Sequence, residues 1–194
     1  MTVPLDTLPD VSDEALLVLY ANGDRAAARA LTLRLTPRIL GFAARMLTDR
    51  TEAEDVTQEA LLRLWRIAPE WRQGEAKVTT WLYRVTSNLC TDRLRRRRGI
   101  ALDDAPEVED DTPSAEQDLM EGERMAALDA ALARLPDRQR QAVLLRHIEG
   151  LTNPDIARIM DIGVEAVESL TARGKRALAA LLSGQRDLIG YEEG

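Results

Sequence analysis

The chain has 194 residues, a length that suits one ordinary domain or two small ones. Charged residues make up 30% of it and hydrophobic residues 45%, which is typical of a globular protein and excludes wholesale disorder. Aromatic residues make up only 4%, and β-branched runs are scarce, so the composition favours helices over a β-sandwich or barrel.

Few residues could support a disulfide, a metal site or a membrane span. One cysteine, Cys90, excludes an internal disulfide framework, and one histidine, His147, leaves little for a zinc site. No apolar stretch approaches the ~20 residues that cross a bilayer, and no basic patch precedes an apolar run at the start. We therefore expect cytoplasmic localisation, no membrane insertion and no cofactor.

The net charge of -7 hides a sharp partition along the chain. Residues 1–24 carry five acids and no base, whereas residues 25–98 carry sixteen bases against eight acids. Residues 99–123 carry ten acids and no base, and residues 124–194 carry ten of each. Because local charge matters more to a polyanion than the total does, the basic N-terminal part remains a candidate nucleic-acid surface.

The acidic connector divides the chain into two predicted domains. Residues 99–113 contain two prolines, repelling like charges and little helical periodicity, so we interpret them as an extended, flexible linker. A solvated acidic loop with no other role is the alternative. The expected fold is all-α, with small helical domains at residues 1–98 and 114–194.

Helices in the N-terminal part are predicted from capping and breaking residues. The first, capped by Ser12 or Asp10, runs to about Ala21 and stops at an Asn-Gly turn. Two more are expected over residues 25–35 and 37–47, separated before Pro37 because proline suits a first helical turn. A capping box beginning at Thr51 then opens a helix to about Ile67. An aromatic loop, about Pro69 to Val78, leads to a last helix over residues 79–98, which ends in a cluster of arginines.

The C-terminal part is predicted to contain four helices. They cover residues 114–135, opened by a second capping box, then a segment after Pro136 to Ile148, a short helix to about Met160, and residues 164–182. The last two are joined by a three-residue turn, and Ile156 and Val167 would fill the angle between them, which indicates a helix-turn-helix. A plain helical hairpin is the alternative.

Two blocks of sequence in this order resemble the ECF (extracytoplasmic-function) sigma factors of bacterial RNA polymerase. Residues 54–65 (EDVTQEALLRLW) resemble the region 2 helix that docks on the polymerase clamp, and residues 81–95 resemble the adjoining helix that reads the -10 element. Residues 135–140 (LPDRQR) and the helix-turn-helix after them resemble region 4, the reader of the -35 element. The resemblance implies a non-enzymatic transcription initiation factor. Its partners would be core RNA polymerase (clamp and flap), promoter DNA and an anti-sigma factor.

The resemblance and the side-chain chemistry together indicate three sets of candidate binding residues. The polymerase-binding candidates are Asp55, Gln58, Glu59, Leu62, Arg63 and Trp65. The candidates for -10 DNA, where basic and aromatic side chains can hold phosphates and unstacked bases, are Trp71, Arg72, Lys77, Tyr83, Arg84, Asn88, Asp92, Arg93, Arg95 and Arg96. The candidates for -35 DNA are Thr152, Glu165, Ala166, Glu168, Ser169, Ala172, Arg173 and Arg176.

Several candidates have simpler interpretations. Trp81 suits a core anchor better than base stacking, Asn88 suits a local cap as well as a DNA contact, and Glu59–Arg63 suits an ordinary i,i+4 pair. A dimeric helix-turn-helix repressor would explain the C-terminal half but not the basic, aromatic segment at residues 69–98. An enzyme fits poorly, because there is no glycine-rich phosphate loop and no pairing of a nucleophile with a base.

Overall fold

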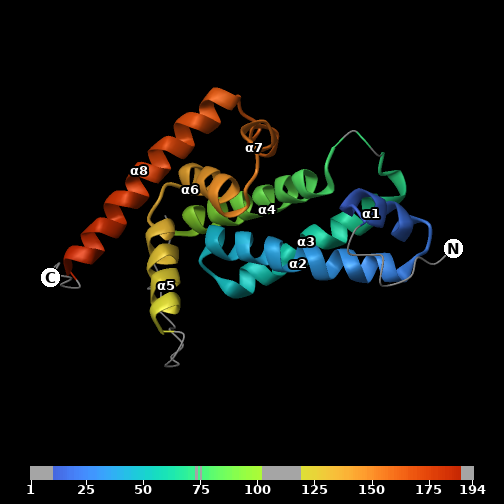
Figure 1. Ribbon diagram of the computed structural model, residues 1–194, viewed down its shortest axis with the longest axis horizontal. Helices are drawn as coiled ribbons and strands as arrows, with labels where there is room; N and C mark the ends of the chain where they lie inside the picture. Colours follow the sequence, from blue (N-terminus) through green and yellow to red (C-terminus); the bar gives the residue numbers. More distant parts are fainter. Residues whose placement is uncertain (1–10, 73, 75, 102–118, 189–194) are drawn as a thin grey trace.

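The computed structural model describes residues 11–72, 74, 76–101 and 119–188, and the regular elements of these residues are all helices (Figure 1). The predicted all-α class is confirmed for this part of the chain. Helices α1 to α4 form what we call the N-terminal bundle, and α5 to α8 form the C-terminal bundle. Most of the predicted linker lies outside the described residues.

The first helix begins and ends where the local sequence predicts. Helix α1 spans Asp13–Ala21, and the Ser12 hydroxyl caps it by accepting from the Ala15 backbone N–H at 3.2 Å. The chain turns at Gly23, which has a φ of +92°, a conformation that glycine adopts without steric cost.

Helix α2 corrects the prediction of two separate helices, because it runs unbroken over Arg25–Leu47 with Pro37 inside. A proline within a helix costs about 3 kcal/mol through its missing N–H and its ring. Leu31, Leu35 and Ile39 are buried on both sides of Pro37 and form one apolar stripe. Burying such side chains gains about 1.5–3 kcal/mol each, which offsets the break.

The cap of α3 differs from the predicted one. Helix α3 spans Arg50–Ile67, and the carboxylate of Asp49, not the hydroxyl of Thr51, accepts from the Glu52 N–H at 2.9 Å. Asp49 has extended backbone angles, as an N-cap requires, whereas Thr51 already lies in the first turn. A short 3-10 helix, η2 at Ala68–Glu70, follows α3.

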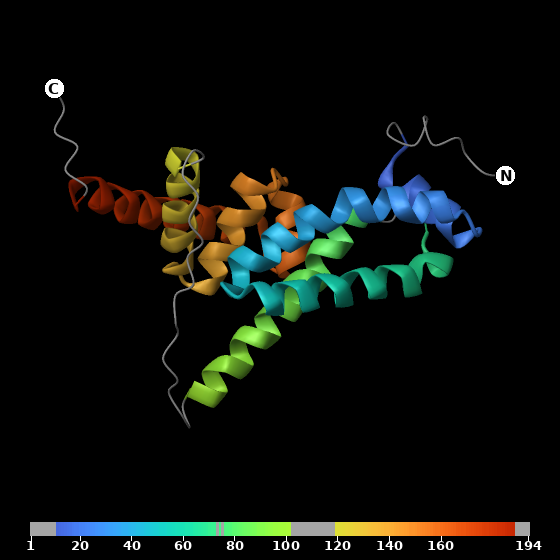
Figure 2. The same cartoon turned by 90° about the horizontal axis from the view of Figure 1, so that it is seen from below.

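Helix α4 spans Val78–Ala101, so the first three residues of the predicted linker are helical. Its last turns project beyond the other helices of the N-terminal bundle (Figure 2). Arg97 fixes the base of this projection, because it donates to the Leu47 carbonyl at 2.9 Å and pairs with Glu52 at 3.0 Å.

The C-terminal bundle follows the predicted order of helices. Its elements are α5 (Leu119–Ala133), α6 (Asp137–Val143), the π-helical turn η3 (Leu144–Ile148), α7 (Asn153–Met160) and α8 (Val164–Leu188). The predicted capping box at Ser114 lies outside the described residues. Helices α6 and α8 cross closely at Gly174, where an added Cβ would lie 2.6 Å from Val143 Cγ2.

Helices α7 and α8 form the predicted helix-turn-helix. The Thr152 hydroxyl caps α7 by accepting from the Asp155 N–H at 3.3 Å. Asp161 makes the turn with a φ of 53°, a left-handed conformation that aspartate tolerates better than most residues. Ile156 and Val167 are fully buried and fill the angle between the two helices.

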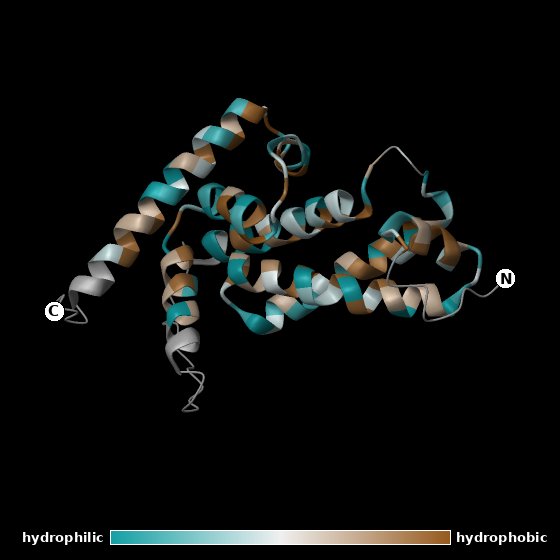
Figure 3. Ribbon diagram, in the orientation of Figure 1, coloured by the Kyte–Doolittle hydropathy of each residue, from teal (hydrophilic) through white to brown (hydrophobic). Residues whose placement is uncertain are grey.

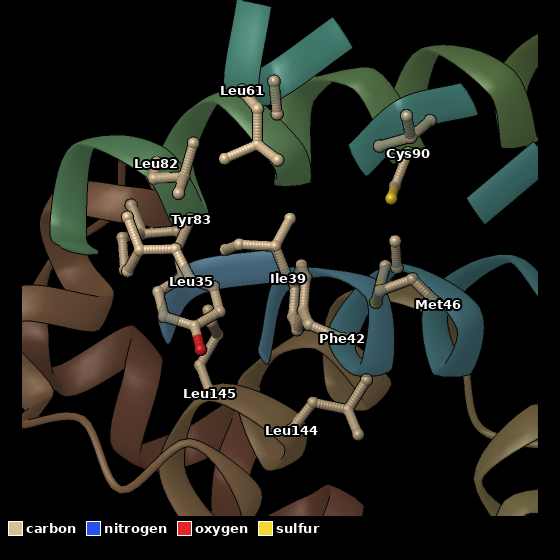
Figure 4. Packing of buried hydrophobic residues seen from close by; sticks show 14 of the residues in the cluster. Leu35, Ile39, Phe42, Met46, Leu61, Leu82, Tyr83, Cys90, Leu144 and Leu145 are labelled. Atoms are coloured by element: carbon tan, nitrogen blue, oxygen red, sulfur yellow. The ribbon is translucent and has the colours of Figure 1, made fainter. Parts of the chain in front are cut away.

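The two bundles share one hydrophobic core. Helix α7 packs on α4, and α5 and α6 pack on α2. Hydrophobic segments alternate with hydrophilic ones along the helices of both bundles (Figure 3). Leu144 and Leu145 belong to the same buried cluster as Leu35, Ile39 and Phe42 (Figure 4). The sequence predicts two domains but does not predict which residues join them.

Candidate nucleic-acid and partner interfaces

One face of α3 gathers most of the residues predicted to bind polymerase. Asp55, Gln58, Glu59, Leu62 and Arg63 follow the i, i+3, i+4, i+7, i+8 spacing of a single helix face. Four of the five are exposed, and Leu62 is 43% exposed, an unusual position for a large apolar side chain. This face is therefore open to a partner.

Two of the predicted polymerase residues also have intramolecular contacts. Arg63 donates to Glu59 at 2.8 Å, the pair expected from the i,i+4 spacing, and this hydrogen bond lowers the pKa of Glu59. Trp65 is half-buried, and its ring lies 4.7 Å from that of Tyr20 on α1. Trp65 therefore lies partly in the core and exposes less of its ring to a partner than its place among the predicted polymerase residues suggests.

A second exposed face runs along α4. It carries five predicted -10 residues that are all exposed, namely Arg84, Asn88, Asp92, Arg95 and Arg96. Arg93 is half-buried, and its guanidinium lies 3.7 Å from the Asp55 carboxylate. This ion pair joins the faces of α3 and α4, so the two predicted interfaces adjoin on one bundle.

A hollow of about 170 Å³ lies where the aromatic loop meets α4. Ile67, Glu70, Trp71, Arg72, Ala76 and Trp81 line it. The rings of Trp71 and Trp81 lie 6.3 Å apart in an edge-to-face arrangement. Trp71 Nε1 is buried and has no acceptor in the described part of the chain.

Tyr83 and Lys77 contact the C-terminal bundle instead of joining the exposed face of α4. Tyr83 is only 1% exposed, and its hydroxyl donates to the Glu149 carboxylate. Burial, with this hydrogen bond, raises the pKa of Tyr83, so it remains a neutral donor. Lys77 Nζ lies 3.9 Å from the Asp155 carboxylate. In this arrangement Tyr83 is not free to meet DNA, whereas the Lys77 side chain is still 69% exposed.

The predicted -35 residues of α8 all lie on its exposed side. They are Glu165, Ala166, Glu168, Ser169, Ala172, Arg173 and Arg176. Thr152 is exposed too, although its hydroxyl caps α7. The carboxylate of Glu168 accepts from Asn153 Nδ2 at 3.3 Å, so α7 holds an acidic acceptor at the exposed surface of α8.

The C-terminal bundle contains an apolar groove that the sequence did not indicate. It has a volume of about 240 Å³ and is lined by Leu128, Leu132, Val143, His147, Ile148, Lys175 and Leu178. Burial, with nearby Lys175 and Arg146, lowers the pKa of His147, which keeps this ring uncharged at neutral pH. The periodicity of α5 and α8 predicts their apolar sides, but not the gap between them.

Cys90 faces the core between α4 and α2 (Figure 4). Burial raises the pKa of its thiol to about 12, so almost no thiolate forms near neutral pH. We expect the folded protein at pH 8 to react with a thiol reagent at least about a hundredfold more slowly than the urea-unfolded chain. Fast reaction of the folded protein would contradict this burial and leave a redox role open.

Comparison with protein families decides between the candidate classes. Residues 31–100 match the Sigma-70 region 2 family, and residues 125–178 match the Sigma-70 region 4 family. The chain is 39% identical over 173 residues to the ECF RNA polymerase sigma factor SigM of Mycobacterium tuberculosis, covering 88% of this chain and 85% of the relative. The chain belongs to the ECF sigma factors. It is also 32% identical over 182 residues to the RNA polymerase sigma-H factor of Pseudomonas aeruginosa, covering 88% of this chain and 94% of that protein.

Solved structures share the fold of this sigma factor. CnrH in complex with the cytosolic domain of CnrY superposes with a TM-score of 0.67 at 23% identity, covering 89% of this chain and 97% of that one. The sigma factor RpoE of Bartonella quintana, in complex with the anti-sigma factor NepR, gives a TM-score of 0.65 at 24% identity over 78% of this chain and 94% of that one. Among the described helices of this sigma factor, none combines the length and apolarity that a membrane crossing requires.

Proposed function

We propose that this sigma factor binds core RNA polymerase through the exposed face of α3 and -10 promoter DNA through the exposed face of α4. The observation that carries the proposal is their adjacency, because the Arg93–Asp55 ion pair joins the two faces on one bundle. DNA held on α4 would then lie beside the bound polymerase. The N-terminal domain, residues 1–98, would carry both tasks.

The hollow lined by Trp71 and Trp81 is proposed to hold an unstacked base of the -10 element. Aromatic side chains stack on bases at about 1–3 kcal/mol per base, and extruding a base costs a few kcal/mol. Arg84 and Arg95, exposed along α4, would contact the phosphates.

The C-terminal domain, residues 114–194, is proposed to read the -35 element with the exposed side of α8. Glu168 departs from the positive charge expected of a phosphate-binding surface. A carboxylate can accept from the amino group of cytosine in the major groove, and the hydrogen bond from Asn153 orients this one. We infer that Glu168 contributes a preference for cytosine at one position.

Glu168→Lys is expected to change base preference at one -35 position by about 1–3 kcal/mol and to strengthen non-specific DNA binding. Selection from a promoter library with holoenzyme measures the preference. Glu168→Gln removes the charge but keeps the size, so it separates base reading from general attraction to phosphates. If both variants select the wild-type sequence, Glu168 does not face the groove.

Regulation by an anti-sigma factor is proposed by analogy, because the sigma factor RpoE of Bartonella quintana has been solved in complex with the anti-sigma factor NepR. The exposed face of α3 is a natural target, since covering it would prevent binding of polymerase. We further propose that the protein is cytoplasmic and non-enzymatic, acting only through binding. The clamp would contact the N-terminal domain and the flap the C-terminal one.

Transcription in vitro tests the proposed function directly. Purified protein and core RNA polymerase are combined with a library of promoters randomised at the -10 and -35 positions, and the transcripts are sequenced. Selective initiation by the assembled pair is the expected result. Failure to bind core polymerase, or a footprint on DNA by the protein alone, would favour the dimeric repressor instead.

A further inference from the structure

Helix α1 carries none of the predicted polymerase or DNA residues, yet it contacts both ends of the aromatic loop between α3 and α4. It packs on η2, where the loop begins, and on the start of α4, where the loop ends (Figure 1). Near η2, the Tyr20 ring of α1 lies 4.7 Å from the Trp65 ring of α3, measured between ring centres. One short helix therefore holds both sides of the loop whose residues line the hollow.

Glu14 makes the contact with α4. Its Oε1 accepts from the Val78 backbone N–H at 2.9 Å, although the two residues are 64 positions apart in the chain. The first N–H groups of a helix have no acceptor within the helix, and a carboxylate at that end is favoured by the helix dipole. Lys77, which precedes α4, has no acceptor on its side chain. Glu14 thus supplies from α1 an acceptor that Lys77 cannot provide.

The position of the first turn of α4 depends on this hydrogen bond. Val78 is fully buried, so water cannot readily replace Glu14 at its N–H. One turn on, the Trp81 N–H donates to the Lys77 carbonyl at 3.1 Å, so Trp81 belongs to the same turn as Val78. Without Glu14 the buried Val78 donor would have to find a new partner, and the turn would shift to reach one. Trp81, which lines the hollow, would move with it.

Helix α1 is itself fixed on α2. Arg34 of α2 donates to the Val11 carbonyl at 2.9 Å and to the Asp13 carboxylate at 2.7 Å, so it holds the chain on the N-terminal side of Glu14. On the C-terminal side, Leu16 is fully buried in the core. Because both neighbouring segments are held, Glu14 extends to α4 from a fixed backbone position.

We propose that Glu14 is a positioning residue for the base-binding hollow, because by fixing Val78 it sets where Trp81 lies relative to Trp71. This inference rests on the proposed capture of a -10 base in that hollow. The two rings lie 6.3 Å apart, so a shift of the first turn of α4 would change the shape of the hollow directly. The exposed faces of α3 and α4 would stay as they are. Glu14 therefore affects which base is accepted, but not binding to polymerase or general attraction to phosphates.

Hydrogen exchange of the Val78 backbone N–H tests the positioning step in the free, full-length chain. NMR should show this N–H exchanging at least about tenfold faster in Glu14→Ala than in the wild type, because the amide has lost its acceptor. Glu14→Gln keeps an acceptor oxygen on a side chain of the same length, so it should keep most of the protection. Ser12→Ala removes the N-cap of α1 without touching α4, and is the control for a loss of stability in α1.

Selection from a promoter library with holoenzyme tests the effect on base recognition. Glu14→Ala should reduce the preference for the favoured base at one -10 position about tenfold, equivalent to about 1.4 kcal/mol. Preferences at -35 and the affinity for core polymerase should not change, and Glu14→Gln and Ser12→Ala should select as the wild type does. A general loss of stability would weaken every position and polymerase binding together, so an effect at a single position separates positioning from a merely structural role.

Unchanged exchange of the Val78 N–H in Glu14→Ala would overturn this role, whatever the promoters show. Faster exchange with wild-type base preferences would also overturn it, since Glu14 would then hold α4 without shaping the hollow. Equal changes in Ser12→Ala would assign the effect to the stability of α1 and not to the contact with Val78. A wild-type holoenzyme with no preference at any -10 position would refute the proposed base site and this role with it, and the exchange measurement, which needs no polymerase, would distinguish that failure from a failure of positioning.

Discussion

Replacing Leu62 with arginine should weaken binding to core RNA polymerase by at least about thirtyfold without unfolding the protein. Leu62 is 43% exposed on the α3 face and is flanked by the charged or polar side chains of Asp55, Gln58 and Arg63. An apolar residue at the centre of an interface can contribute about 2 kcal/mol or more, and arginine there would also bury a charge. Fluorescence anisotropy with labelled sigma factor and core polymerase measures the loss.

Leu33→Arg is the matched control for this experiment. Leu33 is 66% exposed on α2, outside the proposed polymerase face, and receives the same substitution. It should bind polymerase as the wild type does, and both variants should keep the wild-type melting temperature. Equal losses in the two variants, or no loss in Leu62→Arg, would show that α3 is not the docking face.

The second large effect is expected for Arg140→Ala, which should lower the free energy of unfolding by about 3–5 kcal/mol. The Arg140 guanidinium donates to four backbone carbonyls, those of Met46, Leu132, Ala133 and Leu135, at 2.6–3.2 Å. These carbonyls close the ends of α2 and α5, and without arginine they would lose their donors. Burial lowers the pKa of Arg140, while Asp137 at 3.8 Å opposes that shift, so the side chain stays charged.

Urea unfolding followed by circular dichroism measures this loss. Arg138→Ala, two residues away and exposed, is the control and should change the unfolding free energy by less than about 0.5 kcal/mol. Arg140→Lys should fall between the two, because an ammonium cannot reproduce the forked donors of a guanidinium. Wild-type stability of Arg140→Ala would mean that water replaces the lost donors at little cost.

Local chemistry allowed the sequence to predict most helix starts in the described part of the chain. Ser12 and Thr152 cap their helices as expected, because a hydroxyl and the backbone N–H three residues on need no distant partner. The predicted cap at Thr51 was wrong, because Asp49, two residues earlier, satisfies the Glu52 N–H by the same local chemistry. The helix break predicted before Pro37 was wrong for a different reason. Burial of the apolar stripe against other helices stabilises a continuous α2, and such contacts cannot be predicted from local sequence.

The candidate interfaces were predictable where they depend on one helix. The exposed faces of α3 and α8 follow from periodicity, and the family comparison agrees with the motifs that lie on them. The burial of Tyr83 was not predictable, because Glu149 is 66 residues away along the chain and pairs with it only through docking of the bundles. The groove beside His147 was not predictable either, because it depends on how the separate helices of the C-terminal bundle pack.

Pro37 also determines which side of α2 can be covered. Its ring nitrogen has no hydrogen to give to the carbonyl one turn earlier, at Leu33, and both residues lie on the exposed side of the helix. There water can hydrate the orphaned oxygen, whereas a protein surface laid over it would strand an unmet acceptor at about 1–3 kcal/mol. The proline thus disfavours a protein surface over that flank, and the helices that pack on α2 leave it exposed, so a single imino acid limits the directions from which the rest of the molecule can approach.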